Sequence, residues 1–252
     1  MPTLNVHGST LHYVQTGSGS PTLVLVHGAG GTHGTWTRQL EGLADAAHVI
    51  ALDLPGHGAS SGDGCRLVSD YARVVREFIE ALGGGPVVLG GHSMGGAITQ
   101  TVALEAPELL RGIVLVGTAA RLKVFPELLE LLRTDYPGAV DFVARHGWSL
   151  SSPPELLKGV RRATLEIRQT VTFGDYTACN AFELRNRVGR IRLPALVIVG
   201  EEDVLTLPKF SQFLAAEIAG ARLVRIPRAG HYVPLEQPDA VNHAMRAFLS
   251  GL

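Results

Sequence analysis

The sequence has 252 residues, of which 46% are hydrophobic and 18% are charged, with a formal net charge of −1 at pH 7. A chain this apolar can bury a large core, so the composition excludes an intrinsically disordered protein. Because like charges form no long run, the sequence also predicts no nucleic-acid partner and no membrane-surface partner. The length is compatible with one large α/β core.

Two cysteines, Cys65 and Cys179, lie far apart in the sequence. Their small number predicts free thiols in a reducing compartment rather than a disulfide framework. The N-terminal stretch has neither the basic region nor the apolar region of a signal peptide, and no apolar run reaches the roughly 20 residues of a spanning helix. We therefore expect a cytoplasmic protein, either a monomer or a homodimer.

Short apolar runs predict the strands. Alternating polar and apolar residues over 3–16, with Gly8-Ser9 in the middle, predict a β-hairpin. Later runs are apolar throughout, which is typical of parallel strands buried on both faces of a sheet. These runs cover residues 21–26, 48–52, 86–89, 112–116 and 195–199, and a weaker run covers 222–226.

Segments with helical periodicity alternate with these strands. They cover residues 35–46, 68–82, 96–106, 208–219 and 237–250. Alternation of this kind predicts an α/β fold with a mostly parallel central sheet and helices on both faces.

The alternation stops between residues 121 and 190, where no strand-like run occurs. We interpret 121–190 as a helical insertion into a core domain formed by 1–120 and 191–252. The short helices predicted within the insertion cover 127–132, 140–145, 154–170 and 176–188.

The stretch Gly91-His92-Ser93-Met94-Gly95 matches the pattern G-x-S-x-G, which is a weak signal in a chain with 30 glycines. Its context strengthens it, because Ser93 directly follows a predicted strand and directly precedes a predicted helix. So sharp a turn strains the serine backbone and needs small residues on either side. Ser93 is therefore the predicted nucleophile, and the N–H of Met94 is a predicted donor to an oxyanion.

A second match, Gly58-Ala59-Ser60-Ser61-Gly62, has a different context. It lies in a loop that leaves a strand, and no helix begins after it. We interpret Ser60 as a serine of the loop without a catalytic role.

A serine nucleophile needs a base, and the base needs a carboxylate that orients it. His231 and Asp203 each follow a predicted strand, and in a doubly wound sheet such positions gather at the carboxyl ends of the strands. The predicted order is Ser93, Asp203, His231. Glu201 and Glu202 remain alternatives to Asp203, because the chemistry requires only a carboxylate.

The oxyanion needs a second donor, and the glycine-rich loop after the strand 21–26 can supply it. We predict the N–H of Ala29, with Gly28 or Gly30 as the alternative. His27, at the start of this loop, is interpreted as a buried structural residue. His57 and His92 are interpreted in the same way.

Together these residues resemble the α/β-hydrolase fold family over nearly the whole chain, in its serine-nucleophile, esterase-like branch. The matching stretches are His27-Gly28, 53–60, Gly91–Gly95, 200–203 and Gly230-His231. The resemblance implies that residues 121–190 form a helical cap over the site. Serine at position 93 argues against the branches with an aspartate nucleophile, the haloalkane dehalogenases and epoxide hydrolases, and Met94 replaces the tryptophan usual in proline iminopeptidases.

The predicted activity is hydrolysis of small-molecule carboxylic esters through an acyl-enzyme, without cofactor or metal. Apolar side chains of the insertion predict small to medium apolar acyl groups. Most of these side chains are expected to pack the insertion onto the core, and some to line the pocket: Phe125, Phe142, Trp148 and Phe173. Arg121, Lys123, Arg161 and Arg162 either bind a substrate carboxylate or, as we prefer from the sequence, face solvent.

Other activities remain open. The same three residues could serve a C–C bond hydrolase, a lactonase, a thioesterase or a cofactor-free perhydrolase. A lyase and a non-enzymatic ligand receptor are the more distant alternatives on this fold.

Overall fold

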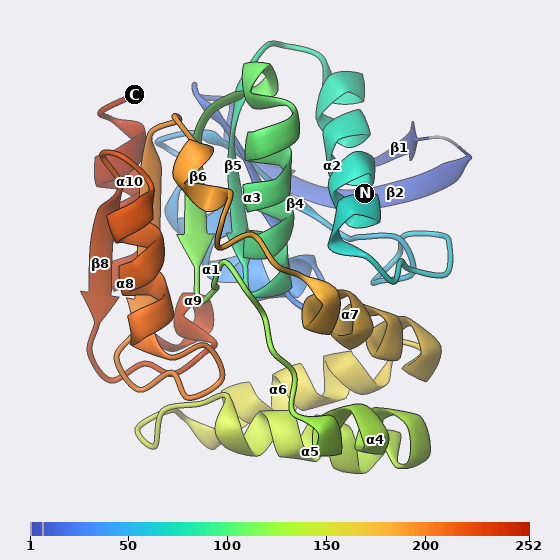
Figure 1. Ribbon diagram of the computed structural model, residues 1–252. Coiled ribbons are helices and arrows are strands. Elements are labelled where there is room, and N and C mark those ends of the chain that lie inside the picture. The colour runs from blue at the N-terminus through green and yellow to red at the C-terminus, as the bar shows by residue number, and fades with distance from the viewer. Residues whose placement is uncertain (1, 7) are drawn as a thin grey trace.

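A computed structural model describes residues 2–6 and 8–252, so Met1 and His7, which fall within the predicted core and hairpin, lie outside the described residues. The described strands form one sheet in the order β1-β2-β4-β3-β5-β6-β7-β8 (Figure 1). The pairs β1–β2 and β2–β4 are antiparallel, and all others are parallel, which confirms the predicted mostly parallel sheet. The strands are Thr3–Val6 (β1), Ser9–Thr16 (β2), Thr22–Val26 (β3), His48–Leu52 (β4), Val87–His92 (β5), Leu110–Val116 (β6), Ala195–Gly200 (β7) and Arg222–Ile226 (β8).

Burial explains why the central strands are apolar throughout. Every residue of β5 and β7 is buried, because helices cover both faces of the sheet there. The edge strand β8 is only partly covered and has exposed arginines at both Arg222 and Arg225. Its run is weaker in the sequence for this reason.

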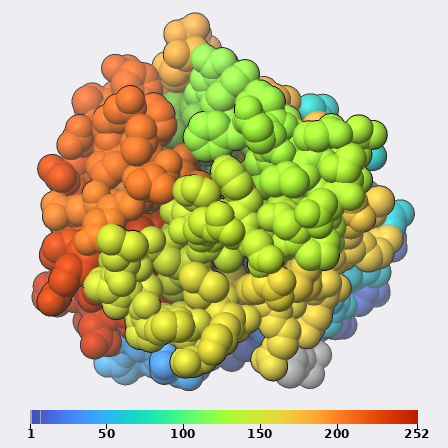
Figure 2. Space-filling model, turned by 90° about the horizontal axis from the view of Figure 1, so that it is seen from below, coloured from blue at the N-terminus to red at the C-terminus, as the bar shows by residue number. Residues whose placement is uncertain are grey.

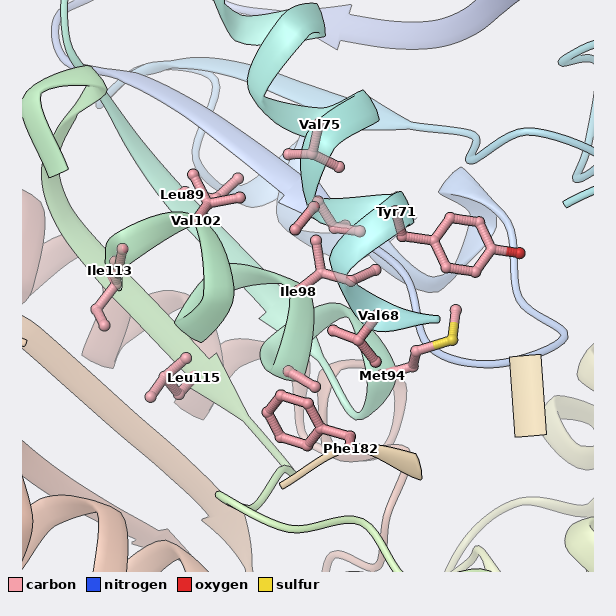
Figure 3. Close-up of a cluster of buried hydrophobic side chains, with 14 of the residues drawn as sticks. Val68, Tyr71, Val75, Leu89, Met94, Ile98, Val102, Ile113, Leu115 and Phe182 are labelled. Atoms are coloured by element: carbon pink, nitrogen blue, oxygen red, sulfur yellow. The ribbon is translucent and has the colours of Figure 1, made fainter. Parts of the chain in front are cut away.

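Helices pack on both faces of the sheet. One face carries α2 (Val68–Leu82), α3 (Met94–Glu105) and α8 (Pro208–Glu217), and Figure 3 shows the apolar cluster between α2, α3 and the sheet. The other face carries α1 (Thr37–Gly42), α9 (Val233–Glu236) and α10 (Pro238–Leu249). Two short 3₁₀ turns lie in the described core, at His33–Trp36 and Pro107–Leu109, and a third, Val188–Arg190, lies at the end of residues 121–190.

The first predicted helix, 35–46, is shorter than expected. Its α-helical part ends at Gly42, and the N–H of Leu43 closes the last turn on the carbonyl of Gln39. Residues 43–46 form turns that lead directly into β4.

Four helices make up most of residues 121–190, which we call the helical segment. They are α4 (Pro126–Thr134), α5 (Tyr136–His146), α6 (Pro154–Leu165) and α7 (Gln169–Ala181). In Figure 1 they lie below the sheet, on the side toward which the strands β6 and β8 point. This side is the carboxyl edge of the parallel strands.

Two helix predictions within this segment are wrong. The helix predicted over 154–170 ends at Leu165. There the hydroxyl of Tyr136 lies 2.7 Å from the carbonyl of Thr164 and 3.1 Å from that of Ile167, and the next helix begins after the extended Arg168. The helix predicted over 176–188 is instead the end of α7, which stops at Ala181. The chain then pairs with the core, where the N–H of Leu184 donates to the carbonyl of Ala120.

No helix within residues 2–6 and 8–252 is long and apolar enough to cross a membrane.

Candidate active site

Ser93 occupies the turn between β5 and α3. Its backbone angles, φ 52° and ψ −114°, lie outside the regions that side chains favour, and among the described non-glycine residues only Arg228 shares a positive φ. A side chain on Gly91 would collide with the carbonyl of Gly95, and one on Gly95 with the carbonyl of Val26. The turn therefore requires the two glycines of the G-x-S-x-G pattern, as predicted.

Hydrogen bonds hold this strained turn in place. The N–H of Ser93 donates to the carbonyl of Val116 at 2.9 Å. The Ser93 carbonyl accepts from the hydroxyl of Thr118 at 2.8 Å. Val116 is the last residue of the neighbouring strand β6, and Thr118 lies two residues beyond it, so the end of this strand positions the serine.

The structure brings His231 and Asp203 together. Nδ1 of His231 lies 2.9 Å from Oδ2 of Asp203, and both side chains are buried. The two loops meet because β7 and β8 are parallel neighbours, so their carboxyl ends are adjacent. The glutamates left as alternatives have other partners: Glu202 accepts from the hydroxyl of Ser149, and Glu201 pairs with Arg225.

Donors around Asp203 keep it charged. Its Oδ1 accepts the N–H groups of Leu205 and Thr206, and its Oδ2 accepts the hydroxyl of Thr206 at 2.6 Å. Burial raises the pKa of Asp203, but His231 and the bonds from Thr206 outweigh burial, so the pKa lies below its usual value. The carboxylate is therefore ionised beside the histidine near neutral pH.

Ser93 and His231 line the same cavity, which has a volume of about 930 Å³. No hydrogen bond joins Oγ of Ser93 to His231 within the described part of the chain. Such bonds are often long in enzymes without substrate and shorten on binding. Nε2 of His231 likewise has no protein partner among the described residues, which leaves it available to the cavity.

The cavity is walled mainly by apolar side chains, and one of the four aromatic residues predicted for the pocket, Phe125, is among them. Phe142 packs on the ring of His146, Trp148 stacks on Tyr232, and Phe173 packs against the core, so these three lie outside the lining. Lining residues that the sequence reasoning missed come from the helical segment and from α8: Val143, Val160, Tyr176, Phe210 and Phe213.

The loop after β3 supplies candidate donors. Ala29, Gly28 and Gly30 all line the cavity, but the N–H of Gly30 already donates to the carboxylate of Asp175 at 2.8 Å. Neither the N–H of Ala29 nor that of Met94 has a protein acceptor among residues 2–6 and 8–252. The side chain of Met94 points away into the apolar cluster of Figure 3, so only its main chain faces the turn.

His27 holds the loop after β3 in place through both of its ring nitrogens. Its Nδ1 donates to the carbonyl of Gly28 at 2.8 Å, and its Nε2 accepts the N–H of Leu54. Burial and the nearby His57 lower the pKa of His27 to about 4, so the ring is neutral. The ring is also fully buried, in agreement with the structural role predicted for it.

His92 is neutral and buried as well. Its Nε2 donates to the carbonyl of His231 at 2.8 Å, and burial together with the His231 ring lowers the pKa of His92 to about 3. His92 therefore supports the main chain of the loop that carries the candidate base.

Asp175 is a buried residue that the sequence reasoning missed. It extends from α7 and accepts from the N–H of Gly30 at 2.8 Å, from Nε2 of His57 at 2.8 Å and from the hydroxyl of Tyr71 at 2.6 Å. A signal for it existed, because Asp175 lies four residues after Val171 and four before Cys179, on the apolar face of the helix. A carboxylate on such a face requires partners.

One described group of side chains has the spacing of a metal site: His12, His33 and Asp53. Nδ1 of His12 lies 2.7 Å from the Asp53 carboxylate and Nδ1 of His33 lies 3.0 Å from it, and the N–H groups of His33 and Ala59 donate to the same carboxylate. Hydrogen bonding accounts for this cluster. Ser60 belongs to it through a 2.7 Å bond to the Asp53 carbonyl, which agrees with the interpretation of Ser60 as a loop residue.

Comparison with known proteins gives the same fold. The chain is 32% identical to the (E)-2-((N-methylformamido)methylene)succinate hydrolase of Acinetobacter baylyi, over 95% of this chain and 94% of that protein. The structure of this chain is similar to that of the enol-lactonase from Burkholderia xenovorans, with a TM-score of 0.92 and 27% identity over 99% of this chain and 100% of that one. It is also similar to a thermophilic esterase from Thermogutta terrifontis, with a TM-score of 0.91 and 28% identity over 100% and 99% of the two chains.

A family model for alpha/beta hydrolases matches residues 23–244, a stretch that contains every element of the candidate site. The central sheet, the strained serine and the order of the three side chains along the chain fit that match. This protein belongs to the alpha/beta hydrolase family.

Proposed function

We propose that this protein is a serine hydrolase that cleaves carboxylic esters of small to medium apolar acyl groups through an acyl-enzyme. One observation carries the proposal. Ser93 stands in a strained turn at the same mostly apolar cavity as His231, and an ionised Asp203 holds that histidine.

Acylation begins with attack of Ser93 Oγ on the ester carbonyl carbon. A C–O bond forms, and the hydroxyl proton passes to Nε2 of His231. Asp203 stabilises the resulting imidazolium and keeps Nδ1 protonated. The tetrahedral intermediate then expels the alcohol, which leaves with the proton from Nε2.

Deacylation repeats these steps with water. His231 takes a proton from the water as its oxygen attacks the acyl carbon, and Ser93 recovers the proton as the carboxylic acid leaves. The net reaction is ester plus water to acid plus alcohol. In both halves the N–H groups of Ala29 and Met94 are the proposed donors to the oxyanion, and their lack of other acceptors supports this role.

The walls of the cavity support the substrate size. A volume of about 930 Å³ lies within the range of small-molecule sites, and the lining is mainly apolar. We assign the helical segment as a cap domain on the core formed by 1–120 and 191–252, because side chains of α4, α5, α6 and α7 contribute to the same lining. Most of the pocket's selectivity would then come from this cap.

Hydrolysis of p-nitrophenyl esters, from acetate to laurate, tests the proposal. We expect wild-type activity with an optimum at short or medium chains, and loss of activity in Ser93→Ala. Covalent labelling of Ser93 by a fluorophosphonate gives an independent readout. Activity that survives in Ser93→Ala would overturn the assignment of the nucleophile.

Lactone hydrolysis is a second candidate, favoured by the similarity to the enol-lactonase over the full chain. The same steps apply, except that the leaving alcohol stays attached to the acyl group. Turnover of a lactone series, measured by acid release with wild type and Ser93→Ala, distinguishes the two. A higher kcat/KM for lactones than for esters would make lactones the preferred class.

A further inference from the structure

The charged side chains that line the cavity all have one sign. Four of them are arginine or lysine, and no aspartate or glutamate occurs among the described lining residues. The whole chain has a formal net charge of −1, so this excess of positive charge is local. The four residues are Arg121, Lys123, Arg185 and Lys209.

The two arginines are partly neutralised, but the lysines are not. Arg121 and Arg185 share the carboxylate of Glu183, at 3.4 Å and 2.8 Å. Within the described residues, neither Lys123 nor Lys209 forms an ion pair. The pocket therefore keeps two unpaired ammonium groups.

The two lysines come from different walls. Lys123 lies on the strap between β6 and α4, and Lys209 lies in the first turn of α8. In Figure 2 the green surface of the strap and the orange surface around α8 lie on either side of a hollow. Both surfaces therefore contribute a lysine to the cavity lining.

Apolar groups surround these charges. Phe125 and Phe210, which line the same cavity, are 53% and 37% exposed. The ammonium of Lys209 lies 5.3 Å from the centre of the Phe210 ring. Lys123 and Lys209 are themselves exposed, so they act at the solvent-facing part of the lining, where salt screens their attraction for an anion. The lining thus combines apolar walls with cationic groups, which suits an apolar chain that ends in an anion.

We propose that the preferred substrates carry a carboxylate, separate from the carbonyl that Ser93 attacks, and that Lys123 and Lys209 bind this carboxylate. The inference rests on the proposed hydrolase function and narrows it to half-esters or lactones of dicarboxylic acids. Lys123 is exposed, as the sequence-based preference for a solvated cation expects, and the proposal adds a substrate carboxylate as its ligand. Arg161 and Arg162 are not among the lining residues of this cavity.

Paired substrates test the inference. Mono-p-nitrophenyl esters of succinate, glutarate, adipate and pimelate are each compared with the p-nitrophenyl ester of the uncharged acid of equal chain length. We expect at least one carboxylate-bearing ester to have the higher kcat/KM. The measured quantity is the ratio of kcat/KM for that ester to kcat/KM for its neutral partner. In the double variant Lys123→Gln/Lys209→Gln this ratio should fall about tenfold. Added salt should lower the same ratio in the wild type.

A matched control is available because the chain has three lysines. Lys158, the third, is exposed on α6, pairs with Glu155 at 3.3 Å and lies outside the cavity lining. Lys158→Gln should leave the ratio unchanged. An equal drop in Lys158→Gln, or an unchanged ratio in the double variant, would overturn the carboxylate site.

A binding measurement separates this inference from the proposed function. Titration calorimetry with Ser93→Ala compares monomethyl glutarate with methyl pentanoate, and the carboxylate-bearing ligand should bind more tightly. Equal affinities together with hydrolysis of neutral esters by wild type would reject the carboxylate site and keep the esterase. Tighter binding of the carboxylate without any hydrolysis would reject the esterase and keep the site.

Discussion

The pair of His231 with Asp203 can be compared with the pair of His57 with Asp175, whose carboxylate also accepts from the loop that carries Ala29. In the first, Nδ1 of His231 is 2.9 Å from Asp203, and in the second, Nε2 of His57 is 2.8 Å from Asp175. All four side chains are buried. The pairs look alike in distance and burial, yet we assign catalysis to only one.

The difference lies in the second ring nitrogen. Nδ1 of His57 is 3.0 Å from the carbonyl of Pro55, so both of its nitrogens face acceptors and both must carry protons. Burial lowers the pKa of His57, but Asp175 outweighs burial and leaves the pKa above its usual value. His57 and Asp175 thus form an ion pair, whereas His231 keeps Nε2 available to the cavity.

The comparison teaches how to separate a catalytic pair from a structural one. A base must exchange a proton, so it needs one nitrogen that can accept the proton of the nucleophile and that no structural hydrogen bond occupies. The pair at His57 instead ties α7 of the helical segment to the core, because Asp175 also accepts from Gly30 and Tyr71. Its contribution is to hold the loop of Ala29 in place.

The largest effect on activity is expected when the two histidines are substituted one at a time. His231→Asn removes the proposed base, and kcat for p-nitrophenyl butyrate should fall about 10⁶-fold. His57→Asn should lower kcat far less, while it lowers the free energy of unfolding more. Steady-state kinetics and urea unfolding on both variants check this. Equal activities in the two variants would contradict the assignment of the base.

The next largest effect on activity is expected from removing the charge of Asp203. Asp203→Asn leaves the shape of the site intact but favours the wrong tautomer of His231, so kcat should fall about 10⁴-fold. Glu202→Gln is the matched control, because this neighbouring carboxylate accepts from Ser149 and does not contact His231. Comparable losses in both variants would reopen the choice of the acid.

Breaking the structural pair should affect folding more than chemistry. Asp175→Asn leaves the His57 imidazolium without its counter-ion, and the free energy of unfolding should fall by about 3 kcal/mol. The control is Asp63→Asn, which cuts the exposed 2.7 Å pair with Arg168 between the same two parts of the chain. This change should have little effect on urea unfolding. A small effect in both variants would contradict the role given to the buried pair.

Sequence reasoning predicted the sheet because its inner strands are apolar throughout. Such a run is recognised without knowing which strands lie beside it. Ser93, Asp203 and His231 were predicted for a related reason: each directly follows a strand, and parallel strands bring their carboxyl ends together. The structure confirms that Asp203 and His231 meet and that Ser93 opens on the same cavity. Their catalytic roles stay predictions until the variants are measured.

Contacts between distant segments were not predictable in this way. Asp175 meets Gly30 and His57 across more than a hundred residues, and only the packing of α7 against the core brings them together. The position of Phe210 and Phe213 in the cavity lining was not predictable either. Periodicity places both on a helix, but it does not show that this helix borders the cavity. Helix ends in the helical segment also depend on such contacts, as the hydroxyl of Tyr136 shows at the end of α6.

The smallest effect concerns the pH dependence of stability. The folded pKa of His57 lies above the unfolded value of 6.5, so its contribution is complete below about pH 6.5 and is lost as the pH rises through the folded pKa. His27 and His92 act in the opposite direction, because their pKa values in the folded protein are about 4 and about 3. Below pH 6.5 the unfolded state binds protons that these buried rings do not bind, so the free energy of unfolding falls as the pH falls toward those values.

Stability should therefore fall on both sides of about pH 6.5, with His57 acting on the alkaline side. His57→Gln should flatten the alkaline decrease and leave the acid decrease in place. Half-exposed His33, whose pKa is raised mainly by its bond to Asp53, retains part of the alkaline slope in that variant. Urea unfolding from pH 4 to 9 measures both slopes. An unchanged alkaline slope in His57→Gln would show that His57 is not the charged partner of Asp175, and the contrast between the two pairs would then rest on geometry alone.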